Sequence, residues 1–216
     1  MKPPKPMILT PIPPDRLDAA LDRFAAQLND PDACAAFAAI RATAAERATE
    51  AVARAHHTEA LALARAAGMT VHPPNTRPGC NWDGHALDGE TEAYVILHEV
   101  AHFVLAPPAR RSLVDFGLGP GPDTTRVDLA ERAQTLSIAE RDAEEACASL
   151  LAILWEATLS QPALASFLDQ NWLEGLERSA APHFTAVLAE LRARGLGCDP
   201  PPSGDADDSI TRRKGL

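Results

Sequence analysis

The chain has 216 residues, enough for one domain with a sizeable core, and 46% of them are hydrophobic, largely as alanine. Such a composition favours helices with closely packed small faces. The formal net charge is −10, which argues against a general nucleic-acid binder or a binder of anionic membranes, because a chain this acidic repels phosphate.

Composition also bears on where the protein is expected to reside. No apolar run reaches the roughly eighteen residues of a transmembrane helix. The first residues lack the apolar core of a secretory signal. The four cysteines are widely spaced and form no CxxC pair, which is typical of free thiols in a reducing compartment. We therefore expect a cytoplasmic protein that binds neither membrane nor nucleic acid.

The chain is expected to form a single domain with two tails. Residues 1–14 are punctuated by proline and should be extended. Residues 15–195 should form one metal-binding domain, in which residues 15–68 supply alanine-rich helices. Residues 31–67 contain no internal glycine or further proline, and predict either one long helix or two helices with a soft break. Residues 196–216 are rich in proline, glycine and aspartate and are expected to be disordered.

The remainder of the domain, residues 69–195, is expected to hold the site. Short strands are predicted around residues 69–72 and 79–83, within a polar loop region. Apolar periodicity predicts two long helices, 89–105 and 137–158, which we expect to face each other.

The helix over 89–105 carries His98-Glu99-x-x-His102, an HExxH motif. Residues four apart lie on one face of a helix, so both imidazoles can reach one metal ion. Glu99, one position round from His98, can then act as the catalytic residue on a water or substrate at that metal. The alternative is a chance pairing of two histidines without a metal.

A third ligand is expected from the helix over 137–158. One stripe of that helix contains Glu140, Glu144, Cys147, Leu151 and Leu154. Carboxylates at the head of an apolar stripe are unfavourable to bury unless something neutralises them, and a metal ion would do so.

The spacing of Glu140 and Glu144 is similar to the ExxA(D/N) pattern of gluzincin-type zinc peptidases. That resemblance implies that Glu140 is the third metal ligand and that Glu144 supports a histidine ligand from behind. Asp142 and Glu145 are expected to face solvent. The alternative for Glu140 is an ordinary charged residue at a helix start.

A second resemblance rests on a longer segment. His98-Glu-Val-Ala-His102, followed by Ala109-Arg-Arg-Ser-Leu-Val-Asp-Phe-Gly117 and the later Glu140, resembles the elongation factor P hydroxylase family, which carries HE-x-(S/A)-H-(W/F) and ARR-x-LVDFG at this distance. It implies a metal held by two histidines and a glutamate, and oxygen-dependent hydroxylation of a modified lysine on a translation factor. The match covers only residues 94–145.

Arg110 and Arg111 are candidates for substrate binding, together with Asp115. Guanidinium groups beside a metal pocket can hold a carboxylate or phosphate through two hydrogen bonds. An arginine that pairs with Asp115 and fixes the loop is an equal alternative.

Three functions follow from this ligand set. The first is a non-haem Fe²⁺ hydroxylase that acts on a protein substrate, the reading favoured by the resemblance. The second is a Zn²⁺-dependent peptidase or other hydrolase with Glu99 as general base. The third is a non-catalytic module with a structural metal. For the fold we expect a mainly α domain of the α+β class, zincin-like, with a small β-sheet beside the HExxH helix.

Overall fold

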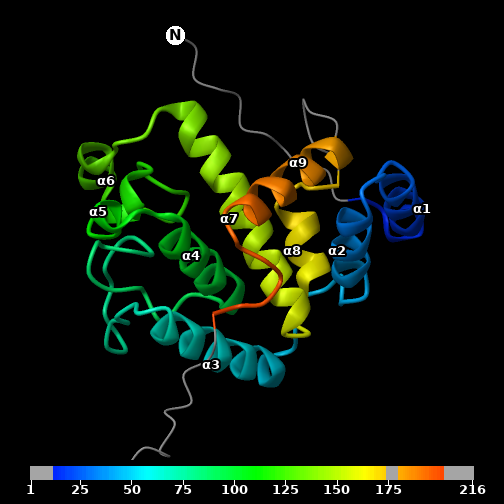
Figure 1. The fold of residues 1–216 in the computed structure, drawn as a ribbon. Helices are drawn as coiled ribbons and strands as arrows, with labels where there is room; N and C mark the ends of the chain where they lie inside the picture. Colours follow the sequence, from blue (N-terminus) through cyan, green and yellow to red (C-terminus); the bar gives the residue numbers. More distant parts are fainter. Residues whose placement is uncertain (1–11, 174–179, 202–216) are drawn as a thin grey trace, which may run out of the picture.

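The computed structural model describes residues 12–173 and 180–201, and these residues form helices and loops (Figure 1). The expected tail and the expected extended segment therefore lie largely outside the described residues. None of the described helices is long and apolar enough to cross a membrane. All four cysteines are free thiols, as predicted.

Helices occur in each of the three ranges for which they were predicted, residues 15–68, 89–105 and 137–158, and further helices lie between and after these ranges. Their bounds are α1 Pro14–Ala25, α2 Pro31–Arg41, α3 Glu50–Ala66, α4 Ala93–Leu105, α5 Pro108–Arg111, the 3-10 turn η1 Val114–Gly117, α6 Val127–Ala133, α7 Ile138–Thr158, α8 Ala163–Asp169 and α9 Ala180–Ala193.

The alanine-rich stretch forms two helices, α2 and α3, because the residues between them dock onto α8. The Thr43 hydroxyl accepts a hydrogen bond from the backbone N–H of Leu164 at 2.8 Å, and the Ala44 carbonyl accepts one from Ala165 at 3.2 Å. These acceptors satisfy N–H groups in the first turn of α8, which have no acceptor within their own helix. The tertiary contact therefore outweighs the helix propensity of the intervening residues.

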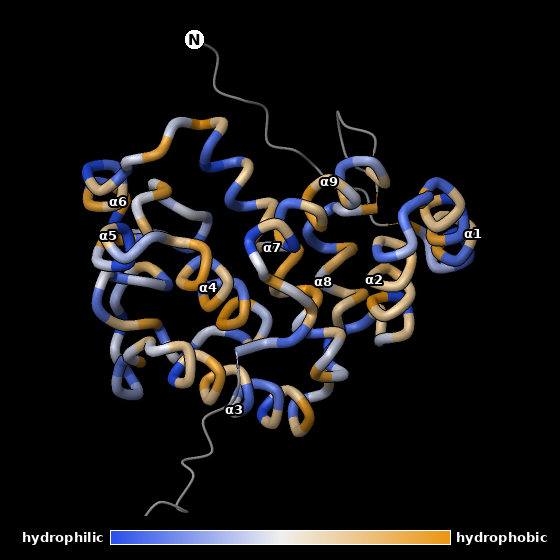
Figure 2. The backbone as a smooth tube through the Cα atoms, in the orientation of Figure 1, coloured by the Kyte–Doolittle hydropathy of each residue, from blue (hydrophilic) through white to orange (hydrophobic). Residues whose placement is uncertain are grey.

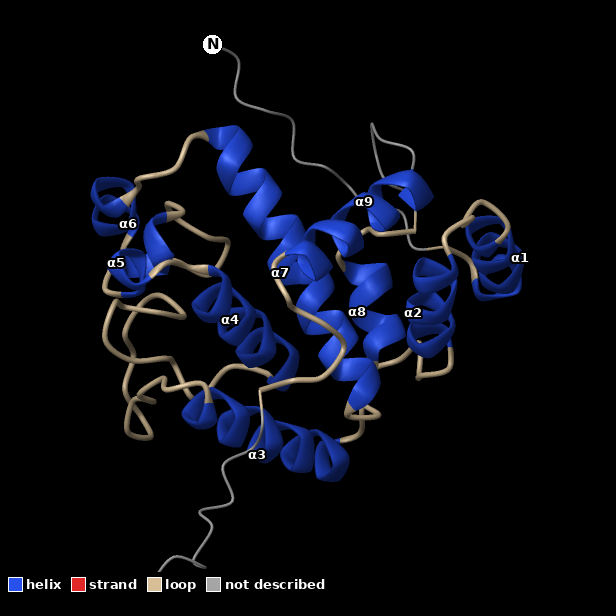
Figure 3. Ribbon diagram, viewed as in Figure 1, coloured by secondary structure: helices blue, strands red, loops and turns tan. Residues whose placement is uncertain are grey.

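The predicted β-sheet beside the HExxH helix is wrong for the part of the chain described, which contains only isolated bridges. Val71 and Trp82 each form a bridge with Leu87, one parallel and one antiparallel, and Figure 3 draws no strand in the described residues. The polar loop around these bridges has too many turns for either pairing to extend into a ladder. The mainly helical class is thus confirmed, whereas the zincin-like arrangement, which was expected to include that sheet, gains no support from the described residues.

The helix α4 lies near the middle of the fold, packed against α3 on one side and α7 on the other (Figure 1). Its tube is coloured mainly towards the hydrophobic end of the scale, whereas the peripheral α1 includes many hydrophilic residues (Figure 2). Leu97, Val100 and Ala101 are fully buried in the core. This packing fixes α4 and α7 against each other, as predicted, and α4 and α7 supply the side chains described next.

Candidate metal centre

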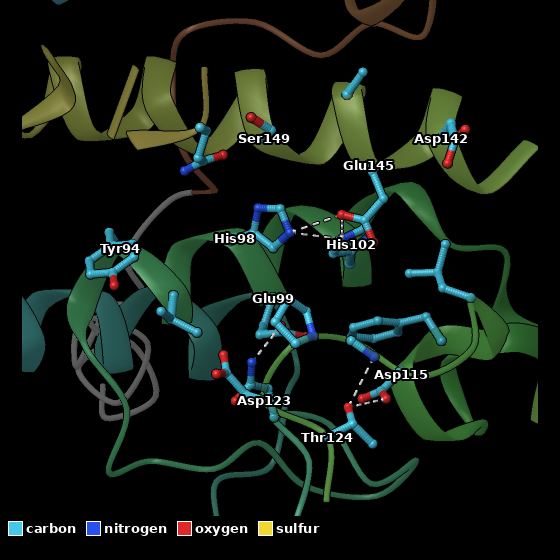
Figure 4. Close-up of a pocket in the computed structure, with 18 of the residues that line it drawn as sticks. Tyr94, His98, Glu99, His102, Asp115, Asp123, Thr124, Asp142, Glu145 and Ser149 are labelled. Carbon is cyan, nitrogen blue, oxygen red and sulfur yellow. Dashed lines mark hydrogen bonds and ion pairs between the residues drawn. The ribbon is translucent and has the colours of Figure 1, made fainter. Parts of the chain in front are cut away.

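Three side chains from α4 and α7 converge on one point (Figure 4). His98 Nε2 lies 3.0 Å from His102 Nε2, and Glu145 Oε2 lies 3.4 Å from each of those nitrogens. Ligand atoms about 2.1 Å from one ion are about 3.0 Å apart at a right angle and about 3.4 Å apart at the tetrahedral angle. The spacing of these three atoms therefore fits a single metal ion.

Helical geometry explains why the two imidazoles meet. His98 and His102 are one turn apart on α4, with ring centroids 4.6 Å apart. His102 is buried, whereas His98 and Glu145 are partly exposed. The donor set is thus covered by protein on the His102 side and accessible on the other, as expected of a site that also admits a substrate.

The charges at the site favour a cation. Burial would raise the pKa of Glu145, but the two adjacent imidazoles hold that pKa well below its usual range. Burial would lower the pKa of His102, but Glu144 and Glu145 raise it to about 10. Burial lowers the pKa of His98. A divalent ion would replace the proton that His102 carries, because metal binding requires the neutral imidazole.

The predicted ligand Glu140 does not join this group. Its carboxylate accepts hydrogen bonds from the Ser137 N–H at 2.9 Å and the Ser137 hydroxyl at 2.7 Å, in a capping box at the start of α7. The side chain is exposed, and Glu145 takes the position that was assigned to Glu140. The alternative stated above, a charged helix start, describes Glu140.

Glu144 lies behind His102, where a supporting residue was expected. Its Oε1 is 3.7 Å from His102 Nδ1, slightly longer than a hydrogen bond, and its Oε2 pairs with Arg110. Burial would raise the pKa of Glu144, but His102 and Arg110 lower it. Arg110, and not a metal ion, is therefore what neutralises the carboxylate on the apolar stripe of α7.

Glu99 points into the cavity beside the triad (Figure 4). Its side chain is buried and accepts a hydrogen bond from Asn81 at 3.2 Å. Burial raises the pKa of Glu99 to about 7, so that near neutral pH it can both accept and release a proton.

The cavity has a volume of about 1150 Å³ and is strongly acidic. The carboxyl-bearing residues in its wall are Glu99, Asp115, Asp123, Asp142 and Glu145. No lysine or arginine from the described residues lines it. Tyr94, Ser149 and Trp172 also form parts of the wall.

Of the three predicted substrate-binding residues, only Asp115 lies at the cavity. Asp115 lines the cavity and accepts a hydrogen bond from Thr124 at 2.7 Å. Arg110 and Arg111 do not line it. Arg110 binds Glu144, and Arg111 donates to the Ala106 carbonyl at 3.0 Å. Neither arginine pairs with Asp115, so both versions of their expected role need correction.

Glu145 was missed because it lies at the edge of the apolar stripe rather than within it. A second pattern on the same helix marks it, since Asp142, Glu145, Ala146 and Ser149 follow i, i+3, i+4, i+7 spacing and all line the cavity. A stripe of polar and small residues beside an apolar stripe is a signal that the sequence carried.

Comparison with known proteins identified no relative. A scan against models of protein families, a search of curated proteins and a search of solved structures each gave no match.

Proposed function

We propose that this protein is a metal-dependent enzyme in which His98, His102 and Glu145 hold one divalent ion. The observation that carries the proposal is the convergence of their three ligand atoms at the wall of a large cavity. A structural zinc site usually closes with four protein ligands, often cysteine. Among the described residues only these three form such a group, which favours catalysis over a structural role.

The reaction we propose is oxygen-dependent hydroxylation, with iron as the metal. Two histidines and one carboxylate are the ligand set of non-haem Fe²⁺ oxygenases, and iron held there would activate dioxygen. One oxygen atom would enter a C–H bond of the substrate and the other would leave as water, with two electrons and two protons supplied by an added reductant. The resemblance to elongation factor P hydroxylases supports this choice, because its ARR-x-LVDFG segment contacts the candidate ligand His102 and the neighbouring Glu144. Phe116 is stacked 5.7 Å from the His102 ring, and Arg110 holds Glu144.

The substrate that suits the cavity carries a positive charge. Asp115, Asp123 and Asp142 line the cavity in addition to the glutamate of the metal triad and Glu99. A substrate amine in such a cavity would be attracted by the carboxylates and could donate hydrogen bonds to them. A lysine-derived side chain on a protein substrate such as a translation factor meets this description. Glu99 would orient that substrate or move a proton.

Hydrolysis with zinc is the second candidate, and one observation favours it. Glu99 is buried and lines the cavity beside the triad, where a general base could take a proton from a metal-bound water. The bound zinc would lower the pKa of that water. Against a peptidase, the described residues offer no exposed strand onto which an extended peptide could pair.

The test begins with protein purified without added metal and loaded anaerobically with Fe²⁺ or with Zn²⁺. Each form is incubated in air with a pool of lysine-containing peptides and with ascorbate as the electron donor, and the products are analysed by mass spectrometry. Peptides that gain one oxygen atom with the iron form alone would support the hydroxylase. Cleaved peptides with the zinc form would support the hydrolase.

His98→Ala is the control, since it should bind neither metal. Glu99→Gln separates the two reactions, because it should abolish hydrolysis while retaining metal and should leave partial hydroxylation. A wild-type protein that binds neither Fe²⁺ nor Zn²⁺ would refute the proposal.

A further inference from the structure

We infer that Arg110, Glu144 and Phe116 form a clamp that positions His102 for metal binding, with Arg110 as its central positioning residue. The inference rests on the proposed metal site and extends it to residues outside the metal triad. The clamp has two arms, one at the Nδ1 edge of the imidazole and one at its face.

The first arm runs from Arg110 through Glu144 to His102. Arg110 Nη2 pairs with one oxygen of Glu144, and the other oxygen faces His102 Nδ1 at 3.7 Å. Both facing atoms are fully buried, and neither has a hydrogen-bond partner among the described residues. A small rotation would form the Nδ1–H to carboxylate hydrogen bond that commonly fixes a metal-binding histidine and leaves its Nε2 for the metal.

The second arm is the ring of Phe116, which is completely buried between two other rings. The centroid of its ring lies 5.5 Å from that of Trp82, at an interplanar angle of 4°. It lies 5.7 Å from that of His102, at an angle of 22°. The imidazole therefore cannot tilt towards that side without displacing Phe116. The first arm fixes the edge of the ring and the second fixes its face.

An unusual backbone conformation joins the two arms. Asp115, Phe116 and Gly117 all have positive φ, at 45°, 52° and 73°. This conformation is rare for residues with a side chain and is unfavourable, so neighbouring contacts must hold it. Arg110 Nη1 donates to the Phe116 carbonyl at 3.0 Å, and the Asp115 N–H donates to the Trp82 carbonyl at 3.0 Å.

One guanidinium group thus serves both arms. Arg110 uses one terminal nitrogen for Glu144 and the other for the Phe116 carbonyl. Lysine has a single terminal nitrogen on a flexible stem, so it cannot reproduce this planar fork. The neighbouring Arg111 is a matched control, since it is directed to the Ala106 carbonyl and the Phe103 ring.

The test measures Zn²⁺ affinity by competition with a chelator, and the visible absorption spectrum of the Co²⁺-substituted protein. Wild type, Arg110→Lys, Glu144→Gln, their double variant and Arg111→Lys are compared. Arg110→Lys and Glu144→Gln should each weaken affinity roughly 10- to 100-fold and change the Co²⁺ spectrum. The double variant should lose less affinity than the sum of the two single losses, because part of the effect of Arg110 passes through the Glu144 carboxylate. Arg111→Lys should resemble wild type.

Phe116→Leu tests the second arm and remains informative if the Arg110 variants do not fold. It should change the Co²⁺ spectrum, because the imidazole gains freedom to tilt. Wild-type affinity and an unchanged spectrum in folded Arg110→Lys would overturn the clamp while leaving the metal site intact. Additive losses in the double variant would also overturn it. A wild-type protein that binds no metal would instead overturn the proposed function itself.

Discussion

Glu156, near the end of α7, should destabilise the folded protein at neutral and alkaline pH. Its side chain is only 1% exposed, and both carboxyl oxygens accept from the Ser166 hydroxyl, at 2.8 and 2.7 Å. Arg47 does not contact the Glu156 carboxyl directly. It donates a hydrogen bond to the same Ser166 hydroxyl at 2.9 Å. Burial raises the pKa of Glu156 to about 7 from a model-peptide value of 4.5.

The size of the effect follows from that difference, about 7 minus 4.5, or about 2.5 pH units. At about 1.4 kcal/mol per unit, deprotonation of folded Glu156 removes up to about 3 kcal/mol of stability. Because the pKa of Glu156 is higher in the folded protein, the stability that its protonated form contributes is fully present below pH 4.5. That stability is lost as the pH rises through about 7. Glutamine resembles the protonated acid in shape and hydrogen bonding, so Glu156→Gln should be free of this loss.

The assay is urea denaturation of wild type and Glu156→Gln at about pH 5 and about pH 8. The variant should match wild type at the lower pH and exceed it by about 1 to 3 kcal/mol at the higher one. Glu131→Gln, an exposed substitution, is the control and should show no such difference. A variant that is less stable than wild type at about pH 8 would mean that Arg47 stabilises an ionised Glu156, and would refute the reasoning.

Two further predictions concern the site. Glu145→Gln should lower Zn²⁺ affinity by more than about tenfold in a chelator competition. Glu140→Gln should keep wild-type affinity and lose only some thermal stability, because its carboxylate caps α7. The reverse pattern would restore Glu140 as the ligand. Gly117→Ala should lower the free energy of unfolding by about 1 to 3 kcal/mol, because φ is 73° and the added Cβ would lie 2.8 Å from Thr135 Oγ1. Urea denaturation measures this free energy. A loss below about 0.5 kcal/mol would contradict the prediction.

The features that could be predicted from sequence are those set by nearby residues. The pair His98 and His102 follows from helical spacing alone, and the start of α7 follows from the Ser137 capping box. The break between α2 and α3 could not be located, because it depends on contacts with α8, more than a hundred residues away.

Tertiary structure also decided which glutamate of α7 meets the histidines. The apolar stripe correctly identified Glu144 as facing inwards, since that residue is buried. The stripe does not tell which neighbouring surface of α7 faces α4, and Glu145 lies on that surface. Likewise, nothing local to Arg110 indicates that it pairs with a glutamate 34 residues further along the chain.

The docking of the α2–α3 connection onto α8 has a consequence for the order in which the protein is made. Thr43 bonds to Leu164, and Arg47 forms an ion pair with Asp169, across separations of 121 and 122 residues. On the ribosome, the alanine-rich helices cannot complete these contacts until α8 has been synthesised and has emerged. Long loops of this kind are slow to close, so the apolar surface of α2 stays partly exposed until α8 is available to pack against it.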